Sequence, residues 1–249
     1  MNKVKINLKG FFEALGESYK EYLQYGSRST EKLRPIHRWI GETYQMLLGN
    51  EYKIYYLDGS ELKVNGRYYP KHVDIGIQKG KKNLFVLSFK FVTSNYKQNV
   101  NNFFENLLGE CANIRTQDIG FGHILVLRNK IPYYEKGRNI KRWEYPDDSD
   151  LGKYIKLFRD RNSFFHSPNY LAIEIVSIDP IVEEIKNKGP GTSGYKEDIS
   201  SYLRNLNITD GIDNTHLTAK LKKFIKTNMS LQKFFKGTIQ FIKEKSKQA

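Results

Sequence analysis

The hydrophobic residues of this chain change their spacing near Tyr52, and this change limits the fold more than any other feature. Two segments before it, 8–24 and 35–48, carry apolar residues at helical spacing. Pro35 is typical of a helix start and Gly49 of a helix stop. From Tyr52 onward apolar and polar residues alternate, which is the period of a strand with one buried face. We therefore expect two helices followed by a sheet.

The alternating region contains strand-like segments separated by short turns that are rich in glycine and charged residues. These segments are 53–57, 61–69, 72–78 and 83–92. Short turns of this kind join neighbouring antiparallel strands. The region therefore predicts an antiparallel meander.

The rest of the chain alternates helical and strand-like segments. We expect, in chain order, a helix at 96–114, a strand at 122–127, a surface excursion at 129–149, a helix at 150–164, a strand at 170–176, a flexible loop at 186–195, and helices at 195–206 and 215–247. This order predicts an α/β (α+β) protein with a mixed β-sheet flanked by helices. We expect residues 1–185 to form the core and residues 186–249 to form a helical, basic C-terminal subdomain or extension.

The chain is strongly basic. Its 41 Lys and Arg against 27 Asp and Glu give a formal net charge of +14 over 249 residues. Such a field attracts polyanions, and on a folded domain it favours nucleic acid over a membrane surface. The alternative is a basic protein without a polyanion partner. No segment approaches the roughly 20 apolar residues of a membrane span, so we expect no membrane partner.

The cysteine content and the N-terminal segment bear on the cellular compartment. Cys111 is the single cysteine, and its place on the apolar side of the helix at 96–114 predicts a core thiol in a reducing compartment. The start of the chain has scattered charges and lacks the apolar stretch of a secretion signal. We expect a cytoplasmic protein. The five histidines show no ligand spacing with Cys111, so structural zinc is not expected.

Three polar side chains interrupt the apolar hairpin around the turn at 79–82. Counting back along this hairpin places Asp74 opposite position 87, within a residue of Ser88. Ser88 and Lys90 share one face because side chains in a strand alternate. The hairpin therefore predicts a carboxylate, a hydroxyl and an ammonium at one end of the sheet.

These groups suit the hydrolysis of a phosphodiester. A carboxylate can bind Mg²⁺, which neutralises phosphate charge while keeping several of its waters. An ammonium can activate the attacking water or stabilise the charge of the transition state. Each residue also has a simpler explanation. Asp74 can be a solvent-facing residue near a turn, and Lys90 an edge lysine with its ammonium in solvent.

The chain resembles the PD-(D/E)XK nucleases, and most closely the type II restriction endonucleases. The resemblance lies in the order of its elements: a helix, a meander that bears these residues, and a second helix. Pro70 and Asp74 correspond to a spread form of the Pro-Asp element, and Lys90 corresponds to the lysine. Ser88 stands where the family has its second acidic residue, as in variants with Ser-x-Lys that take a glutamate from the next helix. The resemblance covers roughly residues 31–128 and implies a restriction-endonuclease-like fold.

The resemblance also implies the catalytic groups. Asp74, a glutamate from the next helix and the backbone carbonyl of Phe89 would hold Mg²⁺, Lys90 would orient the attacking water, and Ser88 would lie beside them.

Three glutamates are candidates to complete this metal site. Glu105 lies well away from the apolar stripe of its helix and follows Lys90 at about the spacing of the family, so it is the first choice. Glu110, on the border of that stripe, is the second. Glu42 corresponds to an acidic residue on the first helix of the family that adds a second-metal or water contact. An ordinary exposed helix residue is the alternative for Glu105.

Basic residues interleaved with aromatic residues predict a surface that contacts DNA. Arginine and asparagine can read the edges of guanine and adenine in the major groove. The candidates are Arg128, Asn129, Lys130, Arg138, Asn139, Lys141, Arg142, Arg159, Arg161 and Asn162. A solvated loop is the alternative for each of them. The basic C-terminal helices are expected to hold phosphates or to form a dimer contact.

The resemblance implies a type II restriction endonuclease that cuts double-stranded DNA at a short sequence and leaves a 5′-phosphate. A homodimer is expected, because two-fold protein symmetry matches a palindromic site. A cognate DNA methyltransferase is implied, without direct contact. A repair nuclease or a junction resolvase is an alternative among enzymes. From another class, a non-catalytic DNA-binding protein on a nuclease-like fold is the alternative, and Ser88 in place of an acid supports it.

Overall fold

The computed structural model describes residues 4–56, 61–136, 138–190, 195 and 199–248, and its centre is a six-stranded mixed sheet. In spatial order the strands are β1 (Lys53–Tyr55), β4 (Ile75–Lys79), β5 (Lys82–Val92), β6 (Gly120–Arg128), β9 (Tyr170–Asp179) and β10 (Asn207–Asp210). β5, β6 and β9 run parallel, whereas the β1–β4, β4–β5 and β9–β10 pairs are antiparallel. The expected mixed sheet is confirmed.

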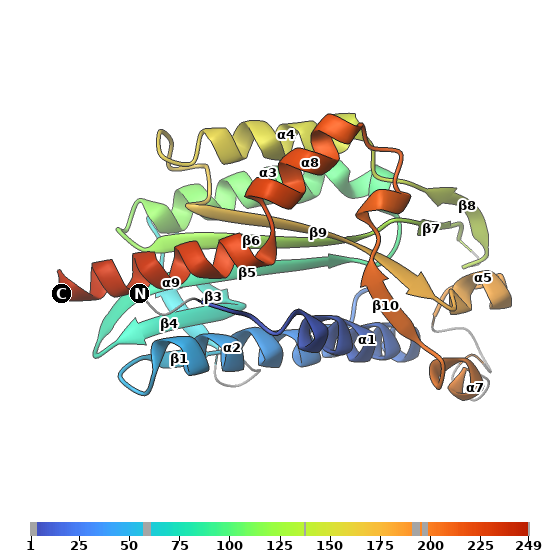
Figure 1. Cartoon of the computed structure of the whole chain (residues 1–249), viewed down its shortest axis with the longest axis horizontal. Coiled ribbons are helices and arrows are strands. Elements are labelled where there is room, and N and C mark those ends of the chain that lie inside the picture. The colour runs from blue at the N-terminus through green and yellow to red at the C-terminus, as the bar shows by residue number, and fades with distance from the viewer. Residues whose placement is uncertain (1–3, 57–60, 137, 191–194, 196–198, 249) are drawn as a thin grey trace.

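Two small hairpins stand beside this sheet. They are β2 (Leu62–Asn65) with β3 (Pro70–Val73), and β7 (Ile131–Tyr134) with β8 (Ile140–Glu144). The first lies near α3, and the second projects at the far end of the molecule from the C-terminus (Figure 1).

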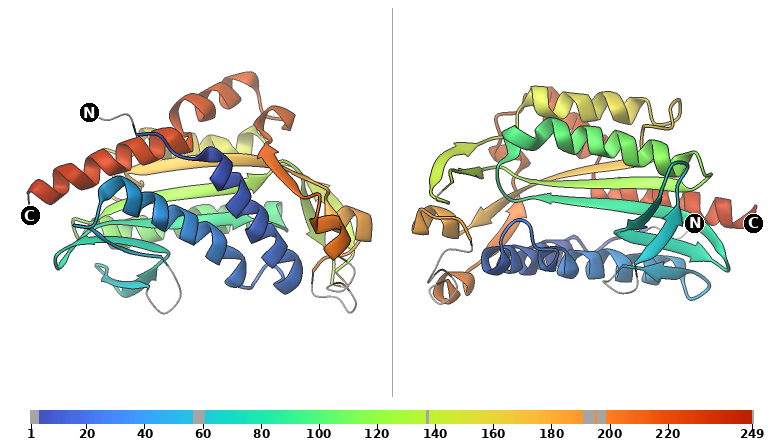
Figure 2. Two further views of the ribbon diagram at one scale, coloured as in Figure 1. Left: turned by 60° about the horizontal axis from the view of Figure 1, so that its bottom comes forward. Right: turned by 180° about the vertical axis from the view of Figure 1, so that it is seen from behind.

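Helices cover both faces of the sheet (Figures 1 and 2). One face carries α1 (Leu8–Tyr25), α2 (Arg34–Leu48) and α9 (Leu231–Lys247), and the other carries α3 (Tyr96–Arg115), α4 (Asp148–Arg159) and α8 (Ala219–Asn228). The short elements are η1 (Glu31–Leu33), α5 (Val182–Lys186), α7 (Ser200–Leu203) and η2 (Ile212–Asn214). Within the described ranges, no helix combines the length and the apolar character needed to cross a membrane.

The alternation of β5 decides which side chains reach which layer. Phe85, Leu87 and Phe89 belong to the core under α1, α2 and α9, whereas Val86 and Val92 belong to the core under α3, α4 and α8. Ser88 and Lys90 have the parity of the second set and therefore face α3. Cys111 of α3 is fully buried in this second core, as expected, and burial raises the pKa of its thiol.

Two of the three antiparallel pairings expected in the meander are confirmed, β2 with β3 and β4 with β5, and the first pairing is corrected. β1 pairs with β4 rather than with β2, and the β2–β3 hairpin is inserted between them. This hairpin buries Leu62, Val64 and Val73 in the core under α3. Asn113 of α3 also binds it, because its Oδ1 accepts the N–H of Tyr68 at 2.9 Å. Packing against a helix distant in sequence therefore outweighs pairing with the nearest strand.

The surface excursion expected at 129–149 is also corrected, since it contains the β7–β8 hairpin and buried residues. Ile131 is fully buried, and Glu144 is buried with its Oε2 accepting the N–H of Lys97 at 2.9 Å. The helix that follows begins at Asp148 and ends at Arg159. Asp147 caps it by accepting the N–H groups of Ser149 and Asp150.

The C-terminal region differs from its expectation in three places. β10 extends the main sheet, the helix expected at 195–206 is helical at Tyr195 and at Ser200–Leu203 among its described residues, and the helix expected at 215–247 divides into α8 and α9. Parts of the loop expected at 186–195 and of the next helix, 191–194 and 196–198, lie outside the described residues. α9 shares a core with α1 and α2. The boundary at residue 185 stays a prediction.

Candidate functional site

Asp74 lies at the bend between β3 and β4, where the chain passes from the small hairpin into the main sheet. A bulge at Ile77 shifts the predicted register, so Ile75 pairs with Leu87 and Asp74 comes level with Ser88. Just beyond this last pair, Asp74 Oδ2 accepts the backbone N–H of Phe89 at 2.8 Å. This hydrogen bond holds the carboxylate against the middle of β5.

Two adjoining pockets collect the polar residues of this region. The first, of about 90 Å³, is lined by Lys71, Asp74, Ser88 and Glu110 among others. The second, of about 110 Å³, is lined by Ser88, Lys90, Glu110 and His123 among others. Ser88 and Glu110 line both pockets, so the expected carboxylate, hydroxyl and ammonium lie in two neighbouring pockets.

The electrostatics of Asp74 reflect burial beside a second carboxylate. Burial is the main cause that raises the pKa of Asp74 to about 6, and the charge of Glu110 contributes to this shift. The N–H of Phe89 and the ammonium groups of Lys71 and Lys90 act in the opposite direction. A carboxyl group with a raised pKa gains affinity for a cation when it ionises, because the cation supplies the stabilisation that solvent does not.

Lys90 has a partly exposed side chain, and the pKa of its ammonium is shifted. Its Nζ lies 4.5 Å from the centroid of the Phe103 ring, which holds the side chain against α3. Burial lowers the pKa of Lys90, while Asp74 and Glu110 oppose this shift. The lowered pKa and the two nearby carboxylates make Lys90 a suitable group to orient a water or to exchange a proton.

Glu110, the second choice from the sequence, joins Asp74 in the pocket, and Glu105 does not. Glu110 is half-buried and forms an ion pair with Lys71 of β3. Glu105 is exposed, and its charge acts on Lys153 of α4 instead. Five residues along a helix turn the side chain by about 140°, so the two glutamates cannot face the same pocket. The preference for Glu105 is therefore corrected.

Of the two other candidates for the metal site, Glu42 lies away from the pocket, whereas the backbone of Phe89 lies beside Asp74. Glu42 is exposed on α2, which covers the face of the sheet opposite to α3, and no described contact joins it to Asp74 or Glu110. The side chain of Phe89 is buried under α2, and its backbone N–H binds Asp74. Glu42 is thus separated from the pocket by the sheet.

The carboxylates that remain fit one magnesium ion with a largely aqueous shell. Among the described residues, no group of three His, Cys, Asp or Glu side chains gathers tightly enough to hold a metal. Mg²⁺ is commonly bound through one or two carboxylates and several waters, which Asp74 and Glu110 can provide. Because Lys71 pairs with Glu110, a cation there would compete with the lysine for this carboxylate.

His123 is a member of the site that the sequence analysis did not select. It lies on β6 level with Ser88, it is only 5% exposed, and it lines the pocket with Lys90. Burial, together with the charge of Lys90, lowers the pKa of His123 to about 3. Its Nδ1 has no hydrogen-bond partner among the described atoms. In the sequence, the feature that could have identified His123 is its position as a polar residue inside the apolar strand 122–127. His72 is exposed at the rim of the first pocket.

Arg128 does not lie on the surface, which corrects its place among the DNA-contact candidates. Its side chain is 1% exposed, and Nη1 binds Glu183 Oε1 at 2.6 Å and the carbonyl oxygen of Thr93 at 3.2 Å. Tyr19 of α1 donates its hydroxyl to the other oxygen of Glu183. This buried network joins α1, β6 and α5, so Arg128 has a structural position.

The other DNA-contact candidates divide between two ends of the molecule. The β7–β8 hairpin and its approach carry Asn129, Lys130, Arg138, Asn139, Lys141 and Arg142, and the C-terminal end of α4 carries Arg159, Arg161 and Asn162. These two regions lie at opposite ends of the long axis (Figure 1). Lys130 is already paired with Glu184, and Arg142 with Glu144. Arg138, Asn139 and Lys141 are exposed.

Comparisons with protein-family models, with curated proteins and with solved structures found no match to this chain.

Proposed function

We propose that this chain is a Mg²⁺-dependent endonuclease of double-stranded DNA with a restriction-endonuclease-like fold. One observation supports it above all others. Asp74 at the end of β3 and Glu110 on α3 line one pocket with Ser88, and Lys90 lies in the space next to it. The charge of +14 supports a polyanionic substrate.

Each group has a chemical task in this proposal. Bound Mg²⁺ would neutralise charge on the phosphate that is cut. Asp74 and Glu110 would hold this ion, and Lys90 would orient the attacking water through its ammonium. Ser88 and the neutral His123 offer hydrogen-bonding groups on the same wall of the pocket. A type II enzyme that acts as a homodimer on a short palindromic sequence is the specific form that we propose.

A cleavage assay tests the proposal. Phage and plasmid DNA are incubated with the protein and Mg²⁺, and we expect discrete fragments that disappear with a chelator. Asp74→Asn and Lys90→Ala are expected to abolish them. Lys156→Ala, on the exposed face of α4, is the matched control and should cut like the wild type. If fragments persist in Lys90→Ala, the proposed chemistry is wrong.

A non-catalytic DNA-binding protein on the same fold is the second candidate. Ser88 favours it, because a hydroxyl occupies the place of a metal-binding acid beside Asp74. This candidate predicts tight, salt-sensitive DNA binding without cleavage in Mg²⁺, Mn²⁺ or Ca²⁺. It also predicts equal DNA affinity for the wild type and Lys90→Ala after correction for the lost charge.

A further inference from the structure

A polar pocket of about 350 Å³ lies at the carboxyl end of β5, beyond Lys90. Its walls come from the turn after α1, from η1, from the end of β5 and from the first turn of α3. Its polar lining residues include Ser27, Arg28, Lys32, Lys90, Asn95 and Asn99. No carboxylate is among its described lining residues. The charged groups that line the pocket are therefore all cationic.

Lys32 is the central cation of this pocket. It is 8% exposed, and its Nζ donates to the carbonyl oxygen of Ser27 at 2.6 Å, which leaves donors of the ammonium for a ligand. Arg28, Lys32 and Lys90 take part in none of the ion pairs among the described residues. Burial is the main cause that lowers the pKa of Lys32 to about 8, and the charge of Lys90 contributes to this shift. An anion in the pocket would relieve both effects.

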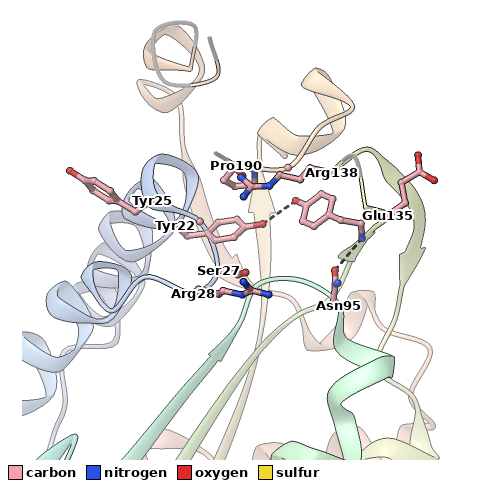
Figure 3. Close-up of a pocket in the computed structure, with 11 residues that line it drawn as sticks. Tyr22, Tyr25, Ser27, Arg28, Asn95, Glu135, Arg138 and Pro190 are labelled. Atoms are coloured by element: carbon pink, nitrogen blue, oxygen red, sulfur yellow. Dashed lines mark hydrogen bonds between the residues drawn. The ribbon is translucent and has the colours of Figure 1, made fainter. Parts of the chain in front are cut away.

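The start of α3 borders the pocket through Asn95 and Asn99. Asn95 precedes the 20-residue helix with a left-handed backbone, and its carbonyl oxygen accepts from Asn99 Nδ2 at 2.9 Å. Asn95 Oδ1 accepts the N–H of Tyr134, which fixes the side chain between α3 and the β7–β8 hairpin (Figure 3). The N-terminal end of a helix carries a partial positive charge, which adds to that of the cations.

The pocket shares lining residues with neighbouring pockets on two sides. Lys90 lines both this pocket and the one that contains Ser88 and Glu110. Ser27, Arg28 and Asn95 also line a pocket of about 290 Å³ that reaches Arg138 of the β7–β8 hairpin. Figure 3 shows Ser27 and Arg28 on the α1 side of that pocket and Asn95 across from them. A run of pockets thus leads from Asp74 past Lys90 and Lys32 to the hairpin.

We infer that the pocket of Arg28, Lys32, Asn95 and Asn99 binds a backbone phosphate of the nucleic acid strand, next to the phosphate that is cut at Asp74 and Lys90. This inference rests on the proposed function for the identity of the strand. The ligand chemistry is a tetrahedral phosphate with negative charge. Lys32 and Arg28 supply the charge, and the side chains of Asn95 and Asn99 supply neutral polar groups.

The first test uses inorganic phosphate as the probe and needs no nuclease activity. Titration calorimetry and ³¹P NMR line broadening are applied to the wild type, Arg28→Met and Lys32→Met. Methionine keeps most of the side-chain volume. The matched controls are Arg204→Met and Lys233→Met, which alter exposed residues elsewhere. We expect phosphate affinity to fall at least tenfold in Arg28→Met and Lys32→Met and to stay unchanged in the controls. Equal affinity in all five proteins overturns the inference.

The second test measures the affinity for a short DNA duplex in Ca²⁺ as a function of salt. Each lost phosphate contact reduces the slope of log K against log salt by about 1. We expect this reduction in Arg28→Met and in Lys32→Met. Arg28 is exposed, so its variant keeps the test valid if Lys32→Met fails to fold. An unchanged slope in Arg28→Met contradicts the inference.

The two proposals can fail separately. If the protein cuts no DNA but the two variants bind inorganic phosphate more weakly, the phosphate pocket is supported and the nuclease proposal is wrong. If the protein cuts DNA and the variants keep both the phosphate affinity and the salt slope, the phosphate pocket is contradicted and the nuclease proposal is supported.

Discussion

At the scale of single residues, the site depends on which glutamate shares the pocket with Asp74. Glu110 does so, and its charge contributes to the raised pKa of Asp74. Glu105 is exposed, and its charge acts on Lys153. The two glutamates lie on one helix, so substitution of each provides a matched comparison.

We expect Glu110→Gln to lower the rate of single-turnover DNA cleavage by about 100-fold or more, because it removes a ligand of the proposed metal site. Glu105→Gln should change this rate less than about threefold. Quench-flow kinetics over a range of Mg²⁺ concentrations gives both numbers. Lys71→Met serves as a further control, because it removes the partner of Glu110 and keeps the carboxylate. A larger loss in Glu105→Gln would restore the original assignment.

Glu174 of β9 makes stability depend on pH. Burial is the main cause that raises its pKa to about 7, although Glu174 Oε1 accepts the N–H of Leu231 at the start of α9. The folded state therefore binds the proton more tightly than the unfolded state, whose pKa is near 4.5. The stabilisation is present below pH 4.5 and is lost as the pH rises to about 7.

Glu174→Gln removes this ionisation and keeps an acceptor for Leu231. We expect the variant to be more stable than the wild type at pH 8, by up to roughly 3 kcal/mol. The difference should shrink toward pH 4.5. Urea unfolding of both proteins at pH 5 and pH 8 measures it. A constant difference across this range would show that Glu174 does not titrate in it.

At the scale of elements, a buried network fastens α1, β6 and α5 to one another. Arg128 of β6 pairs with Glu183 of α5, and Tyr19 of α1 donates to the same carboxylate. Both members of the ion pair are at most 1% exposed. The adjacent Glu184 forms an exposed pair with Lys130 at 2.9 Å. Two neighbouring acids thus bind neighbouring cations in opposite environments.

We expect Glu183→Gln to destabilise the fold by about 3 kcal/mol, because it leaves the charge of Arg128 buried without a counter-charge. Glu184→Gln should cost less than about 1 kcal/mol, because solvent screens the exposed pair. Chemical denaturation monitored by tryptophan fluorescence and circular dichroism compares the two variants. Similar losses in both would mean that burial does not decide the strength of these pairs.

At the scale of the whole molecule, the basic residues predicted to contact DNA do not form one continuous surface. The β7–β8 hairpin and the end of α4 lie at opposite ends of the long axis (Figure 1). The run of pockets from Asp74 leads toward the hairpin, where Arg138 lines the last pocket. DNA held at the candidate site would therefore meet the hairpin first.

We expect the double variant Arg138→Ala/Lys141→Ala to weaken DNA binding several-fold and to reduce the salt slope by about 1 to 2. Arg159→Ala/Lys156→Ala removes the same charge from the opposite end and should have a smaller effect. Fluorescence anisotropy with a labelled duplex, at several salt concentrations, measures both. Equal effects would indicate attraction by net charge alone.

The sequence by itself determined most of the elements, because their signals are local. Apolar spacing predicted α1, α2, α3 and β6 closely, and the hairpin around residues 79–82 placed Asp74 near Ser88. The parity of β5 was enough to put Ser88 and Lys90 on one face. These features depend on residues that are near one another along the chain.

Tertiary packing alone decided how these elements assemble. The β2–β3 hairpin packs on α3 and is not part of the main sheet. β10 pairs at the edge of that sheet although Ile208 is its one buried side chain. The rotation of α3 against the sheet brought Glu110, and not Glu105, to Asp74. Arg128 became buried because Glu183, far along the chain, supplies its counter-charge. Contacts between distant residues decide these outcomes, and periodicity along the chain carries no information about them.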